Sequence, residues 1–278
     1  MPSLLKGTIR KHMKKFKRAI KRRYFLHKMT PRIKEIRGII QYKLSLEHLP
    51  IFKKSGGQGR DLVYLVYQKN QEKPFGVIRM INHFKKYHQD TAKNFFNQPD
   101  DMRIQYEYDI YTSGAAQALT VEPLLKGDDF LLCGYSDYTP LFDDFIKEPE
   151  SFWRYVDFMM PHIGRLHAQD IAHCDMSFSN VLVQGDKAIF IDFEYSYGDV
   201  ITWPEAMLYD YLNLLDNSWK FVPQEIRENE AEIEKWFEKI QTVLGNELKA
   251  VNVEKLKPSL PRLRKEGMFW NRLEVILG

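Results

Sequence analysis

The sequence predicts an α+β fold in which two lobes follow a basic helical arm. Three observations support this prediction. Lysine and arginine are concentrated near the N-terminus, short apolar runs typical of strands follow as far as about residue 135, and helical apolar spacing dominates the remainder. We therefore divide the 278-residue chain into an arm at 1–48, an N-lobe at 49–135 and a C-lobe at 136–278.

The arm combines strong positive charge with an apolar stripe. Residues 1–54 contain 17 Lys or Arg and two acids, a balance of +15, whereas the rest of the chain has a balance of −11. Apolar residues recur at helical steps of three or four, at Leu5, Ile9, Met13, Phe16, Ile20 and Tyr24. Such a helix either binds an anionic membrane surface, through about residues 1–28, or packs on its own domain with a solvated basic face. Nucleic acid is not expected as a partner, because the arm has a continuous apolar stripe rather than aromatic side chains interleaved with the basic residues.

The remaining elements follow from apolar periodicity and from turn residues. Pro31 predicts that the first helix ends there, or that a second helix starts and runs to about Leu46. One helix is predicted in the N-lobe, at 102–117. The N-lobe strands are short apolar runs bounded by turn residues, at 49–54, 61–67, 75–81, 119–125 and 129–135.

The C-lobe is predicted to be mostly helical from about residue 139, with one hairpin. The hairpin pairs 180–184 with 187–193 across Gly185 and Asp186. The predicted helices of the C-lobe have apolar residues at helical spacing, and they lie at 150–169, 203–217, 223–244 and 262–276.

Cysteine usage and hydropathy favour a cytoplasmic protein. The two cysteines, Cys133 and Cys174, are too few for a disulfide framework, and their spacing fits no metal motif. No run of about 18 apolar residues is present, so a membrane-spanning helix is not expected. The N-terminus also lacks the short apolar stretch of a secretory signal.

Three oxygen-bearing side chains surround the predicted hairpin. Asn180 follows Asp175 by five positions, and Asp192 follows Asp175 by 17 positions. Phosphoryl transfer needs one carboxylate facing the attacking hydroxyl and oxygen ligands that hold magnesium against the phosphates. A carboxylate and an amide on one loop, followed by a second carboxylate after a hairpin, can supply these groups.

These residues carry a resemblance to a known family. "HCDMSFSN" (173–180) and "IDFEYS" (191–196) resemble the catalytic and metal loops of the kinase-like phosphotransferases, which include protein kinases, aminoglycoside phosphotransferases, choline kinases and lipopolysaccharide-core sugar kinases. Glu194 stands where protein kinases have glycine, as in small-molecule kinases. The resemblance covers about residues 50–220. It implies a protein-kinase-like two-lobed fold, with a small five-stranded antiparallel N-lobe containing one helix and a mostly helical C-lobe.

The resemblance also implies roles for the motif residues. Asp175 is then the catalytic base, Asn180 and Asp192 hold Mg²⁺, and ATP is the phosphoryl donor. His173 supports the catalytic loop, and Asp210 braces the backbone of that loop. Asp199 and Asp216 are alternatives to Asp210.

The predicted N-lobe contains candidate nucleotide contacts. Gly56, Gly57 and Gly59 lie between two predicted strands, where a loop that covers phosphate belongs. By the resemblance, Arg79 stands in place of the usual strand lysine and pairs with Glu107, with Lys85 and Lys86 as nearby substitutes. The backbone at Leu132 and Gly134 would bind the adenine edge.

The acceptor is open between several classes. "GQGRDLVYLV" (57–66) and "FGVIRM" (75–80) resemble kinases of Kdo and heptose, which act on the lipopolysaccharide inner core at the inner face of the cytoplasmic membrane. "IDFEYS" is instead similar to choline and ethanolamine kinases, and Asp143, Asp144 and Glu205 could attract a cationic acceptor, as in aminoglycoside-type enzymes. The alternative that is not an enzyme is a pseudokinase that binds nucleotide and docks on membranes or partners.

Overall fold

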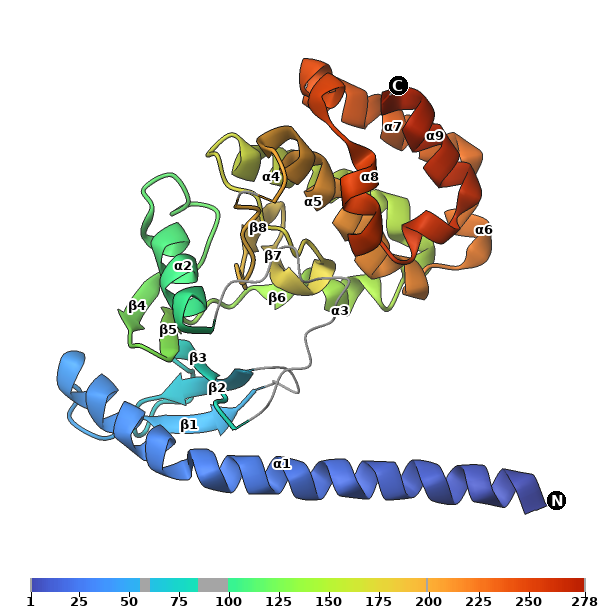
Figure 1. Cartoon of the computed structure of the whole chain (residues 1–278). Coiled ribbons are helices and arrows are strands. Elements are labelled where there is room, and N and C mark those ends of the chain that lie inside the picture. The colour runs from blue at the N-terminus through green and yellow to red at the C-terminus, as the bar shows by residue number, and fades with distance from the viewer. Residues whose placement is uncertain (1, 56–60, 85–99, 199, 278) are drawn as a thin grey trace. The chain divides into compact units, whose positions relative to one another are not determined.

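The computed structural model describes residues 2–55, 61–84, 100–198 and 200–277. The fold is α+β, with an antiparallel five-stranded sheet of order β1-β2-β3-β5-β4 and a three-stranded sheet of order β6-β7-β8 (Figure 1). The predicted α+β class and the five short strands are therefore confirmed. The chain divides into two compact units, one formed by Met1–His88 and Asp129–Tyr135, the other by Gln89–Asp128 and Ser136–Gly278.

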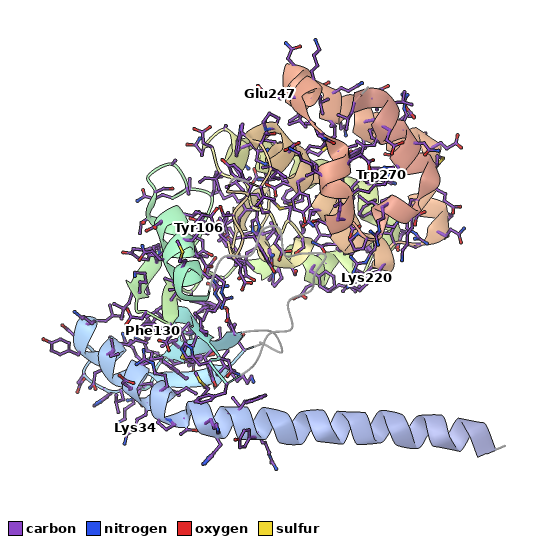
Figure 2. The ribbon with its side chains drawn as sticks, in the orientation of Figure 1. Lys34, Tyr106, Phe130, Lys220, Glu247 and Trp270 are labelled. Carbon is purple, nitrogen blue, oxygen red and sulfur yellow. The ribbon has the colours of Figure 1, made fainter. Side chains whose placement is uncertain are left out.

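The first unit combines a long helix with antiparallel strands. Its described elements are α1 (Pro2–Lys43), β1 (Ile51–Lys54), β2 (Asp61–Tyr67), β3 (Gly76–Ile81) and β5 (Phe130–Gly134). Alternate residues of β2, namely Leu62, Tyr64 and Val66, are buried, as expected when successive side chains point to opposite faces of a sheet. Phe130 on β5 joins this core (Figure 2).

The C-terminal part of α1 is built into the first unit. Met29, Ile36 and Ile40 lie on one face of the helix and are fully buried. Arg37 Nε donates a 2.7 Å hydrogen bond to the carbonyl oxygen of Pro50, at the start of the sheet. Within the described residues, no helix is both long and hydrophobic enough to traverse a bilayer.

The prediction that Pro31 ends the first helix is wrong, because α1 continues through Pro31 to Lys43. A proline inside a helix removes one backbone hydrogen bond and costs about 3 kcal/mol. Burial of Met29 and Ile36 on either side of Pro31, together with the ion pair between Arg32 and Asp129, offsets that cost.

The second unit is mostly helical, with one three-stranded sheet. Its described strands are β4 (Pro123–Lys126), β6 (Thr139–Pro140), β7 (Val181–Gln184) and β8 (Lys187–Phe190). Its described helices are α2 (Asp100–Thr112), α3 (Leu141–Phe145), α4 (Phe152–His167), α5 (Trp203–Ser218), α6 (Gln224–Arg227), α7 (Glu230–Leu244), α8 (Val253–Leu256) and α9 (Gly267–Leu277).

The predicted hairpin is confirmed and positions the loops at both of its ends. β7 and β8 pair antiparallel, with Val181 opposite Phe190 and Gln184 opposite Lys187. β6 adds a third strand in a region predicted to be helical, because a two-residue strand leaves no periodic pattern. The N–H group of Phe190 donates to the carbonyl oxygen of Leu119, at 2.7 Å, so the segment after α2 adjoins the end of β8.

Helix boundaries differ from the prediction where a capping residue intervenes. The segment predicted as one helix at 223–244 forms α6 and α7, because the Asn229 side chain accepts a hydrogen bond from the Glu232 N–H and starts a new helix. The last predicted helix starts later, at Gly267, and its Trp270 is buried (Figure 2).

Candidate active site

The loop before β7 brings Asp175 and Asn180 together. The Asn180 amide group Nδ2 donates to the carbonyl oxygen of Asp175 at 2.9 Å and lies 3.4 Å from its carboxylate Oδ2. The backbone N–H of Asn180 donates to the Ser177 carbonyl at 3.1 Å and closes a single helical turn, Phe178–Asn180. Two of the predicted site residues are therefore neighbours, and the amide oxygen of Asn180 is the atom that could bind a cation.

The loop after β8 places Asp192 beside this pair. The N–H of Ile191 donates to the carbonyl oxygen of Asn180 at 3.0 Å, so the residue next to Asp192 is bonded to Asn180. The backbone of Asp192 has a φ of 69°, in the left-handed region, and the Glu194 N–H donates back to the Asp192 carbonyl. The structure thus gathers the predicted base and the predicted metal ligands on two adjoining loops.

Asp210 on α5 holds the backbone of the predicted catalytic loop, residues 173–180. Its two carboxylate oxygens accept hydrogen bonds from the backbone N–H groups of His173, at 2.8 Å, and Cys174, at 2.7 Å. His167 contributes a third contact, with Nε2 3.0 Å from Oδ2 of Asp210. Asp210 is fully buried, so these partners replace the water that its charge would otherwise need.

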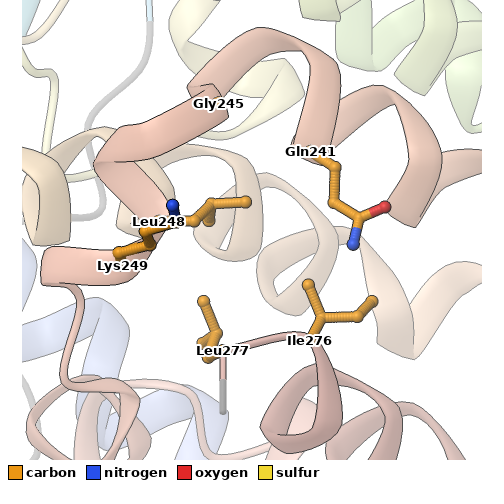
Figure 3. Close-up of a pocket in the computed structure, with 6 residues that line it drawn as sticks. All are labelled: Gln241, Gly245, Leu248, Lys249, Ile276 and Leu277. Atoms are coloured by element: carbon orange, nitrogen blue, oxygen red, sulfur yellow. The ribbon is translucent and has the colours of Figure 1, made fainter.

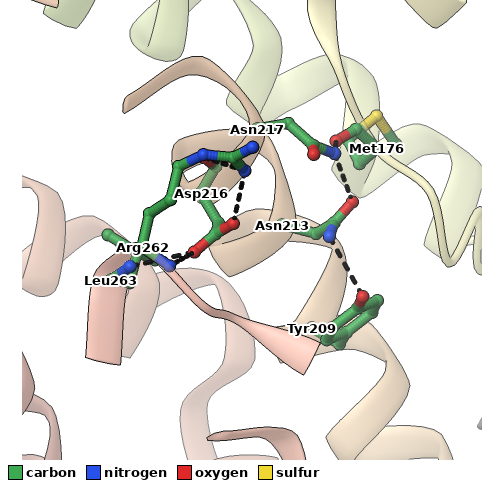
Figure 4. A network of polar contacts seen from close by, with 7 residues as sticks. All are labelled: Met176, Tyr209, Asn213, Asp216, Asn217, Arg262 and Leu263. Atoms are coloured by element: carbon green, nitrogen blue, oxygen red, sulfur yellow. Dashed lines mark hydrogen bonds and ion pairs between the residues drawn. The ribbon is translucent and has the colours of Figure 1, made fainter. Parts of the chain in front are cut away.

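Asp216, one of the two alternatives to Asp210, bonds a different segment of the chain. Asp216, six positions later on α5, accepts bonds from the backbone N–H groups of Arg262 and Leu263 and pairs with the Arg262 side chain (Figure 4). Asp199 lies outside the described residues. The bonds to the catalytic loop are therefore those expected of Asp210.

His173 links the catalytic loop to the metal loop. Its ring is fully buried, and Nε2 donates a 2.9 Å hydrogen bond to the carbonyl oxygen of Ile191. The ring also lies 4.5 Å from the ring of Phe193, centroid to centroid. The supporting role that the sequence predicts for His173 agrees with these contacts.

Helix α2 contributes residues that the sequence reading did not single out. The Tyr111 hydroxyl accepts the N–H of Asp192 at 3.0 Å and donates to Glu107 Oε1 at 2.7 Å. Arg103 Nη1 donates to Glu194 Oε1 at 2.5 Å. No sequence signal marks Arg103 or Tyr111, because they precede the metal loop by more than 80 positions and belong to no motif.

The predicted nucleotide contacts of the N-lobe lie in the other unit. Arg79 is on β3, where its Nη1 lies 3.5 Å from Asp61 Oδ2, and Leu132 and Gly134 are on β5. The predicted pairing of Arg79 with Glu107 concerns residues of different units and stays a prediction. Gly56, Gly57 and Gly59, with Lys85 and Lys86, lie outside the described residues.

Burial and nearby carboxylates raise the pKa of two groups beside the predicted catalytic loop. Burial, together with the charges of Asp210 and Asp175, raises the pKa of the Cys174 thiol well above its ordinary value. Burial and the charge of Asp175 likewise raise the pKa of the Tyr209 hydroxyl. Cys174 therefore stays a neutral thiol, which makes it a packing residue rather than a nucleophile or a metal ligand.

The oxygen donors of Asn180 and Asp192 suit Mg²⁺ better than a metal ion whose ligands all come from the protein. Among the described residues, no group of three or more His, Cys, Asp and Glu side chains is arranged to hold a metal ion. Mg²⁺ needs only one or two carboxylates, because water and substrate phosphates complete its six oxygen ligands. The Asp192 carboxylate and the Asn180 amide oxygen fit that requirement.

A cavity of about 300 Å³ lies elsewhere in the second unit. It is lined by Gln241, Gly245, Leu248, Lys249, Ile276 and Leu277, from the end of α7, the turn after it and the end of α9 (Figure 3). It shares no lining residue with either loop, and it lacks a carboxylate. The chemistry therefore points to the loops rather than to this cavity.

Comparison with known proteins adds no family assignment. No protein-family model matches the chain, and no curated protein matches it. A functional proposal for this chain therefore depends on its own residues and their geometry.

Proposed function

We propose that this chain is an ATP-dependent phosphotransferase with a protein-kinase-like two-lobed fold, which phosphorylates an alcohol group. The observation that carries the proposal is the meeting of Asp175, Asn180 and Asp192 on adjoining loops, through the bonds of Asn180 to Asp175 and to Ile191. A carboxylate beside two hard oxygen donors is the minimum that phosphoryl transfer asks of a protein.

Each residue then has a defined task. Asp175 orients the acceptor hydroxyl and takes its proton. Asn180 and Asp192 hold Mg²⁺, which when bound neutralises the negative charge of the ATP phosphates. His173 and Asp210 keep the catalytic loop in place through its backbone.

The first unit supplies the nucleotide contacts in this proposal. Arg79 holds the phosphates with the planar guanidinium geometry that suits them. The loop with Gly56, Gly57 and Gly59 covers the phosphates, and the backbone at Leu132 and Gly134 binds the adenine edge.

We propose that the acceptor is a lipopolysaccharide inner-core sugar and that the enzyme works at the inner face of the cytoplasmic membrane. Support comes from the basic arm on an otherwise acidic chain. On α1, Lys28 Nζ lies 4.9 Å from the ring centroid of Tyr24 and 5.3 Å from that of Phe84, and the two rings are 53% and 42% exposed. Exposed aromatic rings around a lysine suit the boundary between lipid headgroups and acyl chains.

The two alternatives make different demands. A choline, ethanolamine or aminoglycoside kinase needs acids free to attract a cation. Glu205 does not meet this need, because it is buried, bonds the N–H groups of Thr202 and Asn252, and pairs with Lys255. Asp143 and Asp144 are accessible and remain candidates for that role. A pseudokinase needs no catalytic set, so the retention of Asp175, Asn180 and Asp192 counts against it.

The test is an acceptor screen with a catalytic variant. Purified protein is incubated with ATP and Mg²⁺ and with deacylated core oligosaccharides, choline, ethanolamine or aminoglycosides, and phosphorylated products are measured by mass spectrometry. We expect phosphorylation of the core sugar. Asp175→Asn should lower kcat by about 10²-fold or more, while ATP affinity changes little, because the carboxylate acts on the acceptor.

Asp186→Asn is the matched control, since Asp186 is an exposed carboxylate at the hairpin turn. It should keep wild-type turnover. Asp175→Asn turnover within tenfold of wild type would refute the assignment of the base. Magnesium-dependent ATP binding without any phosphorylated product would instead favour the pseudokinase.

A further inference from the structure

Three side chains of α2 form a polar row that is almost completely buried. Arg103, Glu107 and Tyr111 are spaced by four residues and therefore share one face of the helix. Their exposed fractions are 0%, 3% and 2%. Burying charged side chains is costly unless they are paired, so this row needs specific partners.

Arg103 and Tyr111 have partners in the predicted metal loop, residues 191–196. Arg103 forms an ion pair with Glu194, and the Tyr111 hydroxyl accepts the backbone N–H of Asp192. The ring of Tyr111 also meets the ring of Phe193 edge to face, 5.8 Å between centroids. Helix α2 therefore contacts three consecutive residues, Asp192, Phe193 and Glu194.

These contacts fix a backbone conformation that Asp192 would not choose by itself. With a φ of 69°, Asp192 lies in the left-handed region, which costs non-glycine residues free energy, although aspartate tolerates it better than most. Glu107 accepts the Tyr111 hydroxyl hydrogen and so directs the oxygen lone pairs of Tyr111 toward the Asp192 N–H. Without the Tyr111 oxygen as the acceptor of its N–H group, the backbone of Asp192 can relax and turn its carboxylate away from the proposed Mg²⁺ site.

We propose that Arg103 and Tyr111 are positioning residues that hold the metal loop in its Mg²⁺-binding conformation, an inference that rests on the proposed phosphotransferase function. Helix α2 would act on the reaction through Asp192 rather than by touching substrate. Partners that orient a metal ligand commonly change metal affinity by about 10–100-fold when they are removed.

The sharpest variant is Tyr111→Phe, which keeps the ring on Phe193 and removes only the hydroxyl. ATP binding is measured by calorimetry over a series of Mg²⁺ concentrations, together with turnover of any acceptor found. We expect the half-saturating Mg²⁺ concentration to rise by about tenfold. At saturating Mg²⁺, kcat should return to within about threefold of wild type, because the Asp192 carboxylate is intact.

Tyr108→Phe is the matched control, because Tyr108 lies on another face of α2, where its ring faces Lys126. It should leave the Mg²⁺ dependence unchanged. A second variant, Glu194→Gln, removes the charge that neutralises buried Arg103 and should shift Mg²⁺ dependence in the same direction as Tyr111→Phe. An unchanged Mg²⁺ dependence in both site variants, or one that saturating Mg²⁺ does not rescue, would overturn the positioning role.

Hydrogen exchange separates this inference from the proposed function. The amide of Asp192 should exchange faster in Tyr111→Phe than in wild type, with or without nucleotide, and the Cys174 amide should not change. Unchanged exchange at Asp192 would overturn the inference even if the wild type proved to be an active kinase. If Asp192 exchanges faster in Tyr111→Phe but the wild type never binds Mg²⁺ and ATP, helix α2 still holds the loop. The absence of binding would then overturn both the role in Mg²⁺ binding and the proposed function.

Discussion

At the scale of single residues, the two loops are held in conformations that need outside support. Cys174 and Asp192 have φ values of 59° and 69°. Non-glycine residues in this region cost about 1–3 kcal/mol each. A buried side-chain oxygen accepts the N–H group of each, from Asp210 for Cys174 and from Tyr111 for Asp192. The backbone conformation of both loops therefore depends on side chains that other helices contribute.

We predict that Asp210→Asn destabilises the protein by about 2–3 kcal/mol and greatly lowers turnover. Asparagine has one amide oxygen, so it can accept only one of the two N–H groups, from His173 and Cys174, that Asp210 accepts. Urea unfolding gives the change in free energy. Asp144→Asn, at an exposed pair with Lys147, is the control and should change stability by less than about 0.5 kcal/mol. An equally small effect of Asp210→Asn would contradict its bracing role.

Spacing along the sequence could indicate the site residues that lie close together in the chain. Asp175 and Asn180 share one loop, and Asp192 follows one hairpin later, so the chain itself brings them together. Arg103 and Tyr111 reach the same loops through the packing of α2, which no short-range pattern encodes. Sequence alone also could not show that Asp210 bonds the loop at 173–174 whereas Asp216 bonds Arg262 and Leu263, because these contacts depend on packing.

At the scale of elements, α5 is the scaffold of the second unit. Asp210, Asn213 and Asn217 follow one face, and Asn217 Nδ2 donates to the Met176 carbonyl at 3.0 Å and to Asn213 at 2.9 Å (Figure 4). Asp216 points to the C-terminal segment, where it holds Arg262 and Leu263. One buried helix therefore ties the catalytic loop to the end of the chain.

Helix α1 is attached to the first unit by a carboxylate whose charge depends on pH. Arg32 binds Asp129 through two hydrogen bonds, at 3.0 Å and 2.6 Å, and His83 Nε2 lies 3.0 Å from the same carboxylate. Burial alone would raise the pKa of Asp129, but the bonds from Arg32 and His83 lower it below its ordinary value of 3.8. Asp129 therefore stabilises the fold above about pH 5, and this contribution is lost as the pH falls toward the lowered pKa.

We predict that Asp129→Asn lowers the free energy of unfolding at pH 7 by about 1–2 kcal/mol. Between about pH 5 and pH 3, stability should fall less steeply in the variant than in wild type, because the variant has already lost this charge. Urea unfolding at several pH values measures both effects. The neighbouring exposed Asp128 gives the control Asp128→Asn, which should keep the wild-type pH dependence. If the free energy of unfolding falls equally steeply with pH in Asp129→Asn and in wild type, the pair between Arg32 and Asp129 is not the source of this pH dependence.

Elements with strong local periodicity were predictable, and elements decided by packing were not. The hairpin at Gly185 and the helix at 203–217 match β7, β8 and α5. Pro31 is a local helix-breaking signal that packing of the same helix overrides. β6 exists only because β7 offers it a partner.

At the scale of the whole chain, most of the positive charge of α1 precedes the part of the helix that packs. The described residues that α1 buries start at Met29, whereas the predicted membrane-binding stripe ends at Tyr24. In the first unit, the N-terminal part of α1 extends beyond the strands (Figure 1). A cut between these parts can therefore remove most of the positive charge and keep the packed part of the helix.

We predict that deleting residues 1–28 leaves the fold intact and weakens binding to vesicles rich in anionic lipid. Met29, Ile36 and Ile40 remain buried, and the pair between Arg32 and Asp129 is kept, so the thermal midpoint should change little. Cosedimentation should show wild-type binding that decreases with salt, since exposed charges are screened over about 10 Å at 0.1 M ionic strength. Lys220→Gln, a basic residue of the second unit, is the control for loss of charge as such and should bind like wild type. Equal cosedimentation of the truncated and full-length proteins at low salt would exclude the arm as the membrane contact. It would not bear on the proposed roles of Asp175, Asn180 and Asp192.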